Sequence, residues 1–391
     1  DFDLVVEGDA IGLAEALSAN YGGRVTSHTK FGTAKWHLPD TLSGEAGIDE
    51  TGLLYIDLVT ARREFYQRPS ALPTVERGSI KLDLHRRDFT INTLALRLDG
   101  HHYGELYDYW GGLQDLNNRT IRVLHSLSFV DDPTRMLRAV RFEQRFDFTI
   151  EPRTLELLLE ACDMMDQVSG DRIRHELDSI LVEQRVHKVL SRLDEFELLA
   201  AIHQNLQWDE WLYSRFSSIH TSLPGDDWEL AHYESATMFR KDVLYIIWLM
   251  RLSTNQAQDV IKRLKLPVKQ ANAVTSACEL WLLLPTLHES RPSEIVSKLE
   301  TYPPISRYAI YLASSSEEIR LLLDKYARKW RNIDTNITGD DLKGRGLPPS
   351  PAYRYILKSL RASWLDGEIS TTEQETRLLD QLIKSVDNVN L

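Results

Sequence analysis

The sequence predicts an α+β fold in which a small head with a mixed sheet is followed by an all-α remainder. The alternation and short apolar runs of strands are confined to about the first 125 residues. From about residue 131 onward, apolar residues recur at helical spacing instead. At 391 residues the chain is also too long for one small core, so we expect roughly two to four domains or subdomains.

The head is expected to alternate between strands and helices. A strand over residues 1–6 leads into a helix over 10–20, which ends at the pair Gly22-Gly23. Further elements are short strands over 24–27, 33–38 and 53–59, a long loop over 62–78, and a buried segment over 88–98 with Phe89, Ile91, Leu94 and Leu96.

The remainder is expected to consist of helices, with no internal repeat and no low-complexity tract. The predicted helices cover residues 134–144, 154–165, 172–182, 187–203, 242–252, 255–264, 270–284 and 319–329.

Composition excludes several classes of protein. The chain is 42% hydrophobic and 27% charged, and no apolar run approaches the roughly 18 residues that a membrane span needs. Its two cysteines, Cys162 and Cys278, give neither a disulfide framework nor a zinc site, which fits a reducing cytoplasm. The net charge of −12 argues against a protein that coats nucleic acid without specificity, but it is compatible with a local basic groove.

Two carboxylates open the chain, at Asp1 and Asp3. Strand side chains alternate between faces, so these two point to the same side, where they repel each other unless a cation lies between them. Mg²⁺ with phosphates in its shell is the usual candidate, and a solvated strand end is the ordinary alternative. A third acid, Asp57, lies in the apolar run 53–59. Either that strand end is solvated or Asp57 joins the same metal, because an unpaired buried carboxylate is costly.

Arginines form a second group of candidates. Arg86 and Arg87 precede a buried segment, and guanidinium groups match phosphate oxygens in pairs. Three more recur at every third position, which places them within one broad helix face: Arg135, Arg138 and Arg141. The ordinary alternatives are a solvated pair and a surface helix whose arginines pair with neighbouring acids.

Three segments occur in an order and spacing that make a specific combination. They are residues 86–92 (RRDFTIN), the pair Gly111-Gly112, which predicts a structural turn, and residues 132–142 (DPTRMLRAVRF). With the Asp-x-Asp at its start, the chain resembles the class II tRNA nucleotidyltransferases. This family comprises CCA-adding, CC-adding and A-adding enzymes and bacterial poly(A) polymerases. The resemblance is strong to about residue 181 and weaker beyond it.

The resemblance implies Mg²⁺-dependent nucleotidyl transfer from CTP or ATP to the 3′ end of tRNA. Asp1 and Asp3 match the family's Asp-x-Asp, which holds Mg²⁺. Asp57 matches its third carboxylate, which helps to activate the attacking 3′-hydroxyl. Arg87 and Arg138 match positions that contact the triphosphate. The other residues that the resemblance assigns to nucleotide binding are Gly32, Thr33, Asp88, Asn92, Asp132, Arg135 and Arg141.

Asp132 and Arg135 match the family's base-recognising pair in its Glu-Asp-x-x-Arg motif. Cytosine and adenine each present an amino donor beside a ring-nitrogen acceptor. One carboxylate and one guanidinium can therefore serve both bases and reject guanine and uracil. In this sequence Asp131 replaces the usual Glu, which keeps the charge and shortens the reach.

The resemblance also divides the chain and places tRNA. The parts are a head over 1–125, a neck with base recognition over 126–186, a helical body over 187–270 and a helical tail over 271–391. Between Arg320 and Arg361, ten Lys and Arg stand against four Asp and Glu. We expect tRNA phosphates to dock there, with a solvated surface of mixed charge as the alternative. The expected contacts are Lys325, Arg328, Lys329, Lys343, Arg345, Arg354 and Lys358.

Several alternatives stay open. The chain could add A or CC alone, be a poly(A) polymerase of the family without the usual basic extension, or be a non-catalytic RNA-binding remnant. A segment that the family places before the Asp-x-Asp strand is not in the sequence, so we expect residues before Asp1 to be missing. Residues 62–81 match the family's flexible loop and are expected to be mobile. The oligomeric state is left open.

Overall fold

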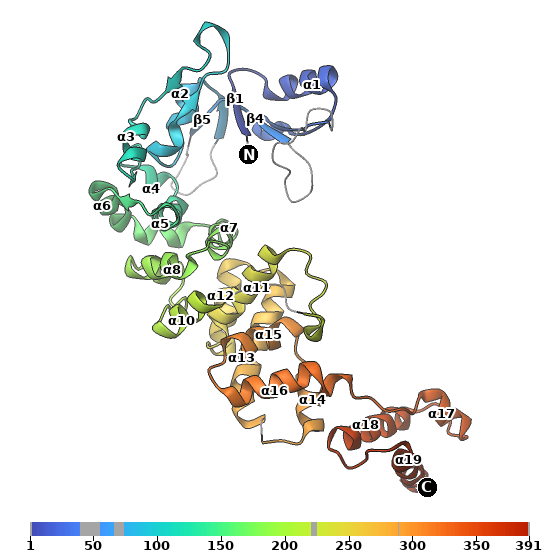
Figure 1. Ribbon diagram of the computed structural model, residues 1–391. Coiled ribbons are helices and arrows are strands. Elements are labelled where there is room, and N and C mark those ends of the chain that lie inside the picture. Colours follow the sequence, from blue (N-terminus) through green and yellow to red (C-terminus); the bar gives the residue numbers. More distant parts are fainter. Residues whose placement is uncertain (1, 40–54, 66–73, 220–224, 288, 390–391) are drawn as a thin grey trace. The chain divides into compact units, whose positions relative to one another are not determined.

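The computed structural model describes residues 2–39, 55–65, 74–219, 225–287 and 289–389 (Figure 1). The chain divides into two compact units. The first comprises residues 1–172 and 195–202, and the second comprises residues 173–194 and 203–391. The finer division into head, neck, body and tail stays a prediction.

A four-stranded mixed sheet begins the first unit. Its strands are β1 (Phe2–Val6), β2 (Arg24–His28), β3 (Thr33–His37) and β4 (Tyr55–Thr60). They follow the order β1-β4-β3-β2, with β1 parallel to β4 and β3 antiparallel to both of its neighbours. The predicted mixed sheet is therefore confirmed. Residues 53–54 of the predicted fourth strand lie outside the described residues.

One face of this sheet is apolar and packs against helix α1 (Ala10–Tyr21; Figure 1). Side chains alternate along each strand, so every second residue reaches this face. Asp9 caps the helix by accepting a hydrogen bond from the N–H of Gly12 at 3.1 Å. The buried residues of this layer are Ala10, Ala14, Ala34, Trp36 and Leu58. The opposite face of the sheet carries the intervening, more polar residues.

The glycine pair Gly22-Gly23 ends helix α1, as expected, and close packing leaves no room for a side chain at Gly23. Gly22 and Gly23 both adopt positive φ, 83° and 91°. A Cβ on Gly23 would lie 2.2 Å from the carbonyl oxygen of His37. The indole N–H of Trp36 donates to the carbonyl of Gly22 at 3.0 Å, which ties the helix end to β3.

The predicted loop over residues 62–78 is wrong at its ends, which form an antiparallel hairpin of β5 (Arg62–Phe65) and β6 (Thr74–Arg77). Arg63 and Glu76 are in register and form an ion pair of 2.6 Å. Charged side chains face each other here, so the apolar alternation that predicts a strand is absent. Residues 66–73 lie outside the described part of the chain.

Short elements complete the first unit. They are the 3-10 helix η1 (Thr29–Phe31), α2 (Ile80–His85), η2 (Thr90–Thr93), β7 (Ala95–Leu96), η3 (Gly100–His102), β8 (Leu106–Tyr107), α3 (Gly112–Asn117), β9 (Thr120–Ile121), α4 (Ser128–Asp131), α5 (Thr134–Phe146), β10 (Thr149–Ile150), α6 (Pro152–Glu160), η4 (Cys162–Gln167) and α9 (Leu198–Ile202). The predicted helix over 154–165 is thus split between α6 and η4. In the segment 88–98, Phe89 is buried as expected. Leu96 is 57% exposed, because it pairs with exposed Leu106 in a ladder of only two residues.

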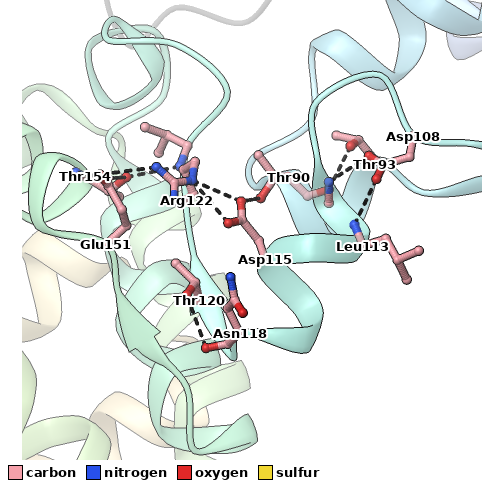
Figure 2. Close-up of polar contacts among 12 residues, drawn as sticks. Thr90, Thr93, Asp108, Leu113, Asp115, Asn118, Thr120, Arg122, Glu151 and Thr154 are labelled. Carbon is pink, nitrogen blue, oxygen red and sulfur yellow. Dashed lines mark hydrogen bonds and ion pairs between the residues drawn. The ribbon is translucent and has the colours of Figure 1, made fainter.

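Polar contacts hold the segment from η2 to β9 together (Figure 2). The Asp108 carboxylate accepts a hydrogen bond from the N–H of Gly112 at 2.7 Å, where α3 begins. Gly112 has no room for a side chain, since a Cβ would lie 2.3 Å from the carbonyl oxygen of Thr90. The Thr90 hydroxyl donates to Asp115 on the same helix at 2.7 Å. With Gly111 at a φ of 74°, the predicted structural turn is confirmed.

The second unit is helical (Figure 1). Helix α7 (Gly170–Leu181) begins at the end of the first unit. It is followed by α8 (Val186–Glu195), α10 (Glu210–Ser218), η5 (Asp226–Trp228), α11 (Ala236–Leu249), α12 (Thr254–Leu264), α13 (Val268–Leu287), α14 (Pro292–Leu299), α15 (Pro304–Ala313), α16 (Glu317–Arg328), η6 (Trp330–Asn332), α17 (Gly339–Gly344), α18 (Pro351–Leu365) and α19 (Thr372–Val389). The helix predicted over 187–203 is broken, because Glu197 adopts a φ of 59° between α8 and α9. Within the described ranges, no helix combines the length and apolarity needed to cross a membrane.

Candidate active site

Three charged residues lie in a row across the open face of the sheet. Asp3 on β1 is in register with Asp57 on β4, and Asp57 is in register with Lys35 on β3. Residues in register on neighbouring strands share a face, so the two carboxylates and the ammonium lie side by side. Asp57 Oδ1 and Lys35 Nζ are 3.7 Å apart, and these side chains are 30% and 37% exposed.

Asp3 and Asp57 fit a site for a hard divalent cation. Both offer carboxylate oxygens, which are the ligands that Mg²⁺ prefers, and Asp3 is exposed. Two aligned negative charges also need a counter-charge. Lys35 pairs with Asp57 and not with Asp3. Asp1, which was predicted to hold the metal together with Asp3, lies outside the described residues. Within the described part of the chain, no group of three potential metal ligands occurs.

Sequence reasoning missed Lys35. Its ammonium lies 3.5 Å from the centre of the Tyr55 ring, a contact that holds the charge beside Asp57. The available signal was its position between Ala34 and Trp36, which are both buried. A lysine between two buried strand residues must point to the opposite face of the sheet, where Asp57 also points.

Gly32 and Thr33 lie at the start of β3, beside the end of β4. Gly32 has a φ of 60°, and its carbonyl accepts a hydrogen bond from the N–H of Thr60 at 2.9 Å. Thr33 is in register with Val59, which shares the face of Asp57. The structure therefore brings both residues near the carboxylate row. Their role in nucleotide binding stays a prediction.

Asp88 joins the segment before η2 to helix α5. Its Oδ2 accepts a hydrogen bond from Arg138 Nε at 2.8 Å, and Arg138 Nη2 lies 2.6 Å away. Its Oδ1 accepts from Asn92 Nδ2 at 2.8 Å. Arg87 donates from Nη1 to the carbonyl of Asn92 at 3.3 Å. Four predicted nucleotide-binding residues thus form one hydrogen-bonded group, which we call the Asp88 cluster: Arg87, Asp88, Asn92 and Arg138.

Asp132 and Arg135 are close in the chain but bind different partners. Arg135 is 6% exposed, and it donates from Nη1 to Ser128 Oγ and from Nη2 to the carbonyl of Arg86, both at 2.7 Å. Asp132 Oδ1 accepts from the Thr134 hydroxyl at 2.6 Å. The Arg135 guanidinium is therefore held by Ser128 and Arg86, whereas the Asp132 carboxylate is held by Thr134 at the start of α5. Joint base recognition by the pair stays a prediction.

Arg172 is a further residue at this site that sequence reasoning did not single out. Its Nη2 lies 2.6 Å from Asp132 Oδ1, and the two side chains are 27% and 19% exposed. The available signal was the place of Arg172 in the first turn of α7. A cation is unfavourable at a helix N-terminus unless a nearby acid compensates it.

The three arginines of α5 have separate surroundings. Arg138 and Arg141 both lie near the Phe142 ring, with guanidinium carbons 5.2 Å and 5.0 Å from its centre. Arg135 is buried beneath the helix start. The acid bound by Arg138 is Asp88, 50 residues away in the sequence, and not a neighbouring acid of the same helix.

All seven residues predicted to contact tRNA are exposed. Arg328 pairs with Asp324 at 2.8 Å, and Arg345 pairs with Asp380. The other five form no ion pair with the residues that the structure describes: Lys325, Lys329, Lys343, Arg354 and Lys358. Their contact with tRNA stays a prediction.

Two family models match the chain. Residues 1–122 match the poly(A) polymerase head domain. Residues 147–208 match a model described as a probable RNA- and SrmB-binding site of polymerase A. The first match covers the carboxylate row and most of the Asp88 cluster.

Three similar proteins extend these matches to nearly the whole chain. An A-adding tRNA nucleotidyltransferase of Geobacter sulfurreducens is 36% identical over 98% of the chain, which spans 43% of that longer protein. One of Halalkalibacterium halodurans is 31% identical over 95% of the chain and 82% of the relative. The solved Thermotoga maritima CCA-adding enzyme complexed with tRNA-CCA matches with a TM-score of 0.68 and 30% identity, over 98% of this chain and 86% of that one. The chain thus belongs to the family of tRNA nucleotidyltransferases that share the poly(A) polymerase head domain.

Proposed function

We propose that the protein transfers AMP from ATP to the 3′ end of a tRNA that already ends in CC. The observation that carries nucleotidyl transfer is the alignment of Asp3 with Asp57 on the open face of the head sheet. The choice of A addition rests on two relatives that are 36% and 31% identical over 98% and 95% of the chain, both of which are named A-adding enzymes.

In this reaction the 3′-hydroxyl oxygen of the RNA attacks the α-phosphorus of ATP, a phosphodiester bond forms, and pyrophosphate leaves. Asp3 and Asp57, together with Asp1, would hold Mg²⁺, which neutralises phosphate charge and orients the triphosphate. Asp57 is the candidate to accept the proton that the hydroxyl loses. Lys35 pairs with Asp57 at 3.7 Å, so its ammonium would compete with a metal ion for that carboxylate.

The Asp88 cluster is the candidate site for the triphosphate. Arg87 and Arg138 offer guanidinium groups that match phosphate oxygens. Asp88 restricts the rotation of Arg138 before the nucleotide arrives, so less side-chain entropy is lost on binding. Arg138 would keep one N–H group on Asp88 while another turns to phosphate.

Asp132 and Arg135 are the candidate readers of the base. The Asp132 carboxylate would accept from the adenine amino group, and the Arg135 guanidinium would donate to the ring nitrogen. Arg172 binds one oxygen of Asp132, which supports the other oxygen as the acceptor for the base. A pair of this kind selects A and C over G and U but does not by itself separate A from C.

Full CCA addition is the second candidate. It is favoured by the match to the Thermotoga maritima CCA-adding enzyme, which covers 98% of this chain at 30% identity. The same base-reading pair would then serve CTP in the first two steps and ATP in the third.

Three tRNA substrates separate the candidates. They lack the CCA end, end in one C, or end in CC, and each is incubated with Mg²⁺ and either CTP or ATP. One A on the CC end and no C on the shorter ends is the expected result. Incorporation of C would establish CC or CCA addition instead. Long A tails on unrelated RNA would establish a poly(A) polymerase, and tRNA binding without any incorporation would overturn nucleotidyl transfer.

A further inference from the structure

Four aromatic side chains form a continuous row on the first unit. Consecutive ring centres are 5.5 Å apart from Tyr109 to Trp110, from Trp110 to His85, and from His85 to His125. The two imidazole rings at the end are nearly parallel, with 15° between their planes. We call this set the aromatic row: Tyr109, Trp110, His85 and His125.

The aromatic row is not part of a buried core. Tyr109 is 44% exposed, His85 is exposed, and Trp110 and His125 are half-buried. Aromatic rings gain most when they are removed from water, so four connected rings at the surface favour a binding role. Lys81 places its ammonium 5.4 Å from the centre of the Tyr109 ring, which adds a cation to the exposed end of the row.

The histidine end of the row lies beside the proposed base-reading arginine. His85 precedes Arg86, whose carbonyl accepts from Arg135 Nη2 at 2.7 Å. The other hydrogen-bond partner of Arg135 is Ser128, whose N–H donates to the carbonyl of His125 at 3.2 Å. Arg135 is thus held by neighbours of both histidines.

The row is also linked to the strand that carries Asp3. The carboxylate of Glu7, which directly follows β1, accepts a hydrogen bond from the N–H of Ile80 at 2.6 Å. Ile80 begins α2, and His85 ends it. Helix α2, about one and a half turns long, therefore separates the end of the strand that carries Asp3 from the aromatic row.

Charge favours stacking at this end. Burial, together with Arg135 and His85, lowers the pKa of His125, against the opposing effect of Asp131. The lowered pKa favours the neutral form of the His125 ring, which stacks on His85 without adding a positive charge.

We propose that the aromatic row is the surface on which the 3′-terminal bases of the single-stranded RNA end stack during nucleotide transfer. This inference rests on the proposed function and adds the residues that position the acceptor. Sites for single-stranded RNA combine rows of aromatic rings with cations, as here with Lys81. The row spans three ring-to-ring steps of 5.5 Å, which is more than a single base needs. The base of the incoming nucleotide is assigned instead to the pair Asp132 and Arg135.

Binding of RNA tests this surface without relying on catalysis. The probe is a fluorescent tRNA acceptor minihelix that ends in single-stranded CC, titrated with the full chain in the absence of nucleotide. We expect His85→Ala and His125→Ala each to weaken binding by about 10-fold. His125→Phe keeps an aromatic ring and is expected to bind within about 2-fold of the unaltered protein. Tyr103→Ala removes a ring that is 75% exposed on the same unit outside the row, and it serves as the matched control.

Steady-state kinetics then identify which substrate the row holds. The expected result is a rise of about 10-fold in the KM for tRNA ending in CC, with the KM for ATP unchanged. A rise in the KM for ATP alone would assign the row to the incoming base and overturn the proposal. Unchanged minihelix binding in both alanine variants would overturn it as well. So would failure of His125→Phe to restore binding when its thermal stability equals that of the unaltered protein. If the unaltered protein binds the minihelix but adds no nucleotide, the proposed function fails while the stacking surface stands.

Discussion

The two acids on the sheet, Asp3 and Asp57, and the Asp88 cluster differ in how their negative charge is compensated. On the sheet, Asp3 and Asp57 stand in register, and Lys35 reaches Asp57 at only 3.7 Å. In the cluster, Asp88 binds Arg138 at 2.6 and 2.8 Å and is almost buried. The first arrangement keeps negative charge for a cation from solution, whereas the second is neutralised before any substrate arrives. We therefore expect changes on the sheet to affect chemistry, and changes in the cluster to affect both stability and nucleotide binding.

Replacement of Asp3 tests the sheet and has the largest expected effect. Asp3→Ala removes a candidate metal ligand and should lower kcat by about 10³-fold or more, because charge stabilisation at the reacting phosphate is lost. Asp3 is exposed, so the melting temperature should change little. Single-turnover rates with tRNA ending in CC measure the loss. Glu15→Ala, an exposed acid on α1, is the control and should keep full activity. Unchanged turnover in Asp3→Ala would remove the metal assignment.

Replacement of Asp88 tests the cluster. Asp88→Asn keeps the shape but leaves Arg138 without its anionic partner, and we expect a loss of about 1–3 kcal/mol in the free energy of unfolding. The KM for ATP should rise by about 10-fold, since the arginines lose their fixed positions. Urea denaturation and steady-state kinetics measure the two effects. Asp99→Asn breaks the exposed pair with Arg97 and should leave the free energy of unfolding nearly unchanged. Equal losses in both variants would show that the cluster is an ordinary surface feature.

Replacement of Arg172 tests whether an arginine fixes the position of Asp132, as Arg138 does for Asp88. Arg172→Gln removes a charge-assisted hydrogen bond worth about 1.5–3 kcal/mol, so the KM for ATP should rise by about 10-fold or more. Discrimination against GTP should fall at the same time, because Asp132 is no longer oriented. Arg172→Lys keeps the charge and should lie between. A rise in KM with unchanged discrimination would limit Arg172 to general support of the fold.

Replacement of Lys35 has the smallest expected effect and sharpens the contrast. Lys35→Met removes the cation that competes for Asp57, and a partly exposed pair of this kind is worth about 0.2–1 kcal/mol. Mn²⁺, used as a probe ion, should therefore bind about 1.5- to 5-fold more tightly, as measured by electron paramagnetic resonance titration. Lys30→Met, an exposed lysine before β3, is the control. Weaker ion binding in Lys35→Met would show that Lys35 positions Asp57 instead of competing for it.

The layers of the fold were predictable because their patterns are local. The short apolar run in Phe2–Val6 and the alternation in Thr33–His37 identify strands, and apolar spacing in Thr134–Phe146 identifies a helix. The hairpin of β5 and β6 was missed because Arg63 and Glu76 stabilise each other across strands, and neither is apolar. The break at Glu197 was missed because a glutamate is not a residue type that predicts a positive φ.

The sequence identifies most residues of the candidate site but not which of them contact each other. Asp57 was identified because a lone acid in an apolar run needs compensation. Its neighbour Lys35 depends on the register between β3 and β4, which sequence spacing does not fix. Arg172 lies 40 residues from Asp132, and Arg138 lies 50 residues from Asp88. Such pairs become visible only once the chain has folded.

Strand β1 has one more property, which follows from its place in the sheet. Within the described residues it is the first strand in the order β1-β4-β3-β2, so its outer side has no strand partner. A short apolar edge such as Leu4 to Val6 invites pairing with the same strand of another molecule. Asp3 places a negative charge on that edge, and two copies brought together would repel each other. We therefore expect the replacement of Asp3 by an apolar residue to lower colloidal stability as well as activity.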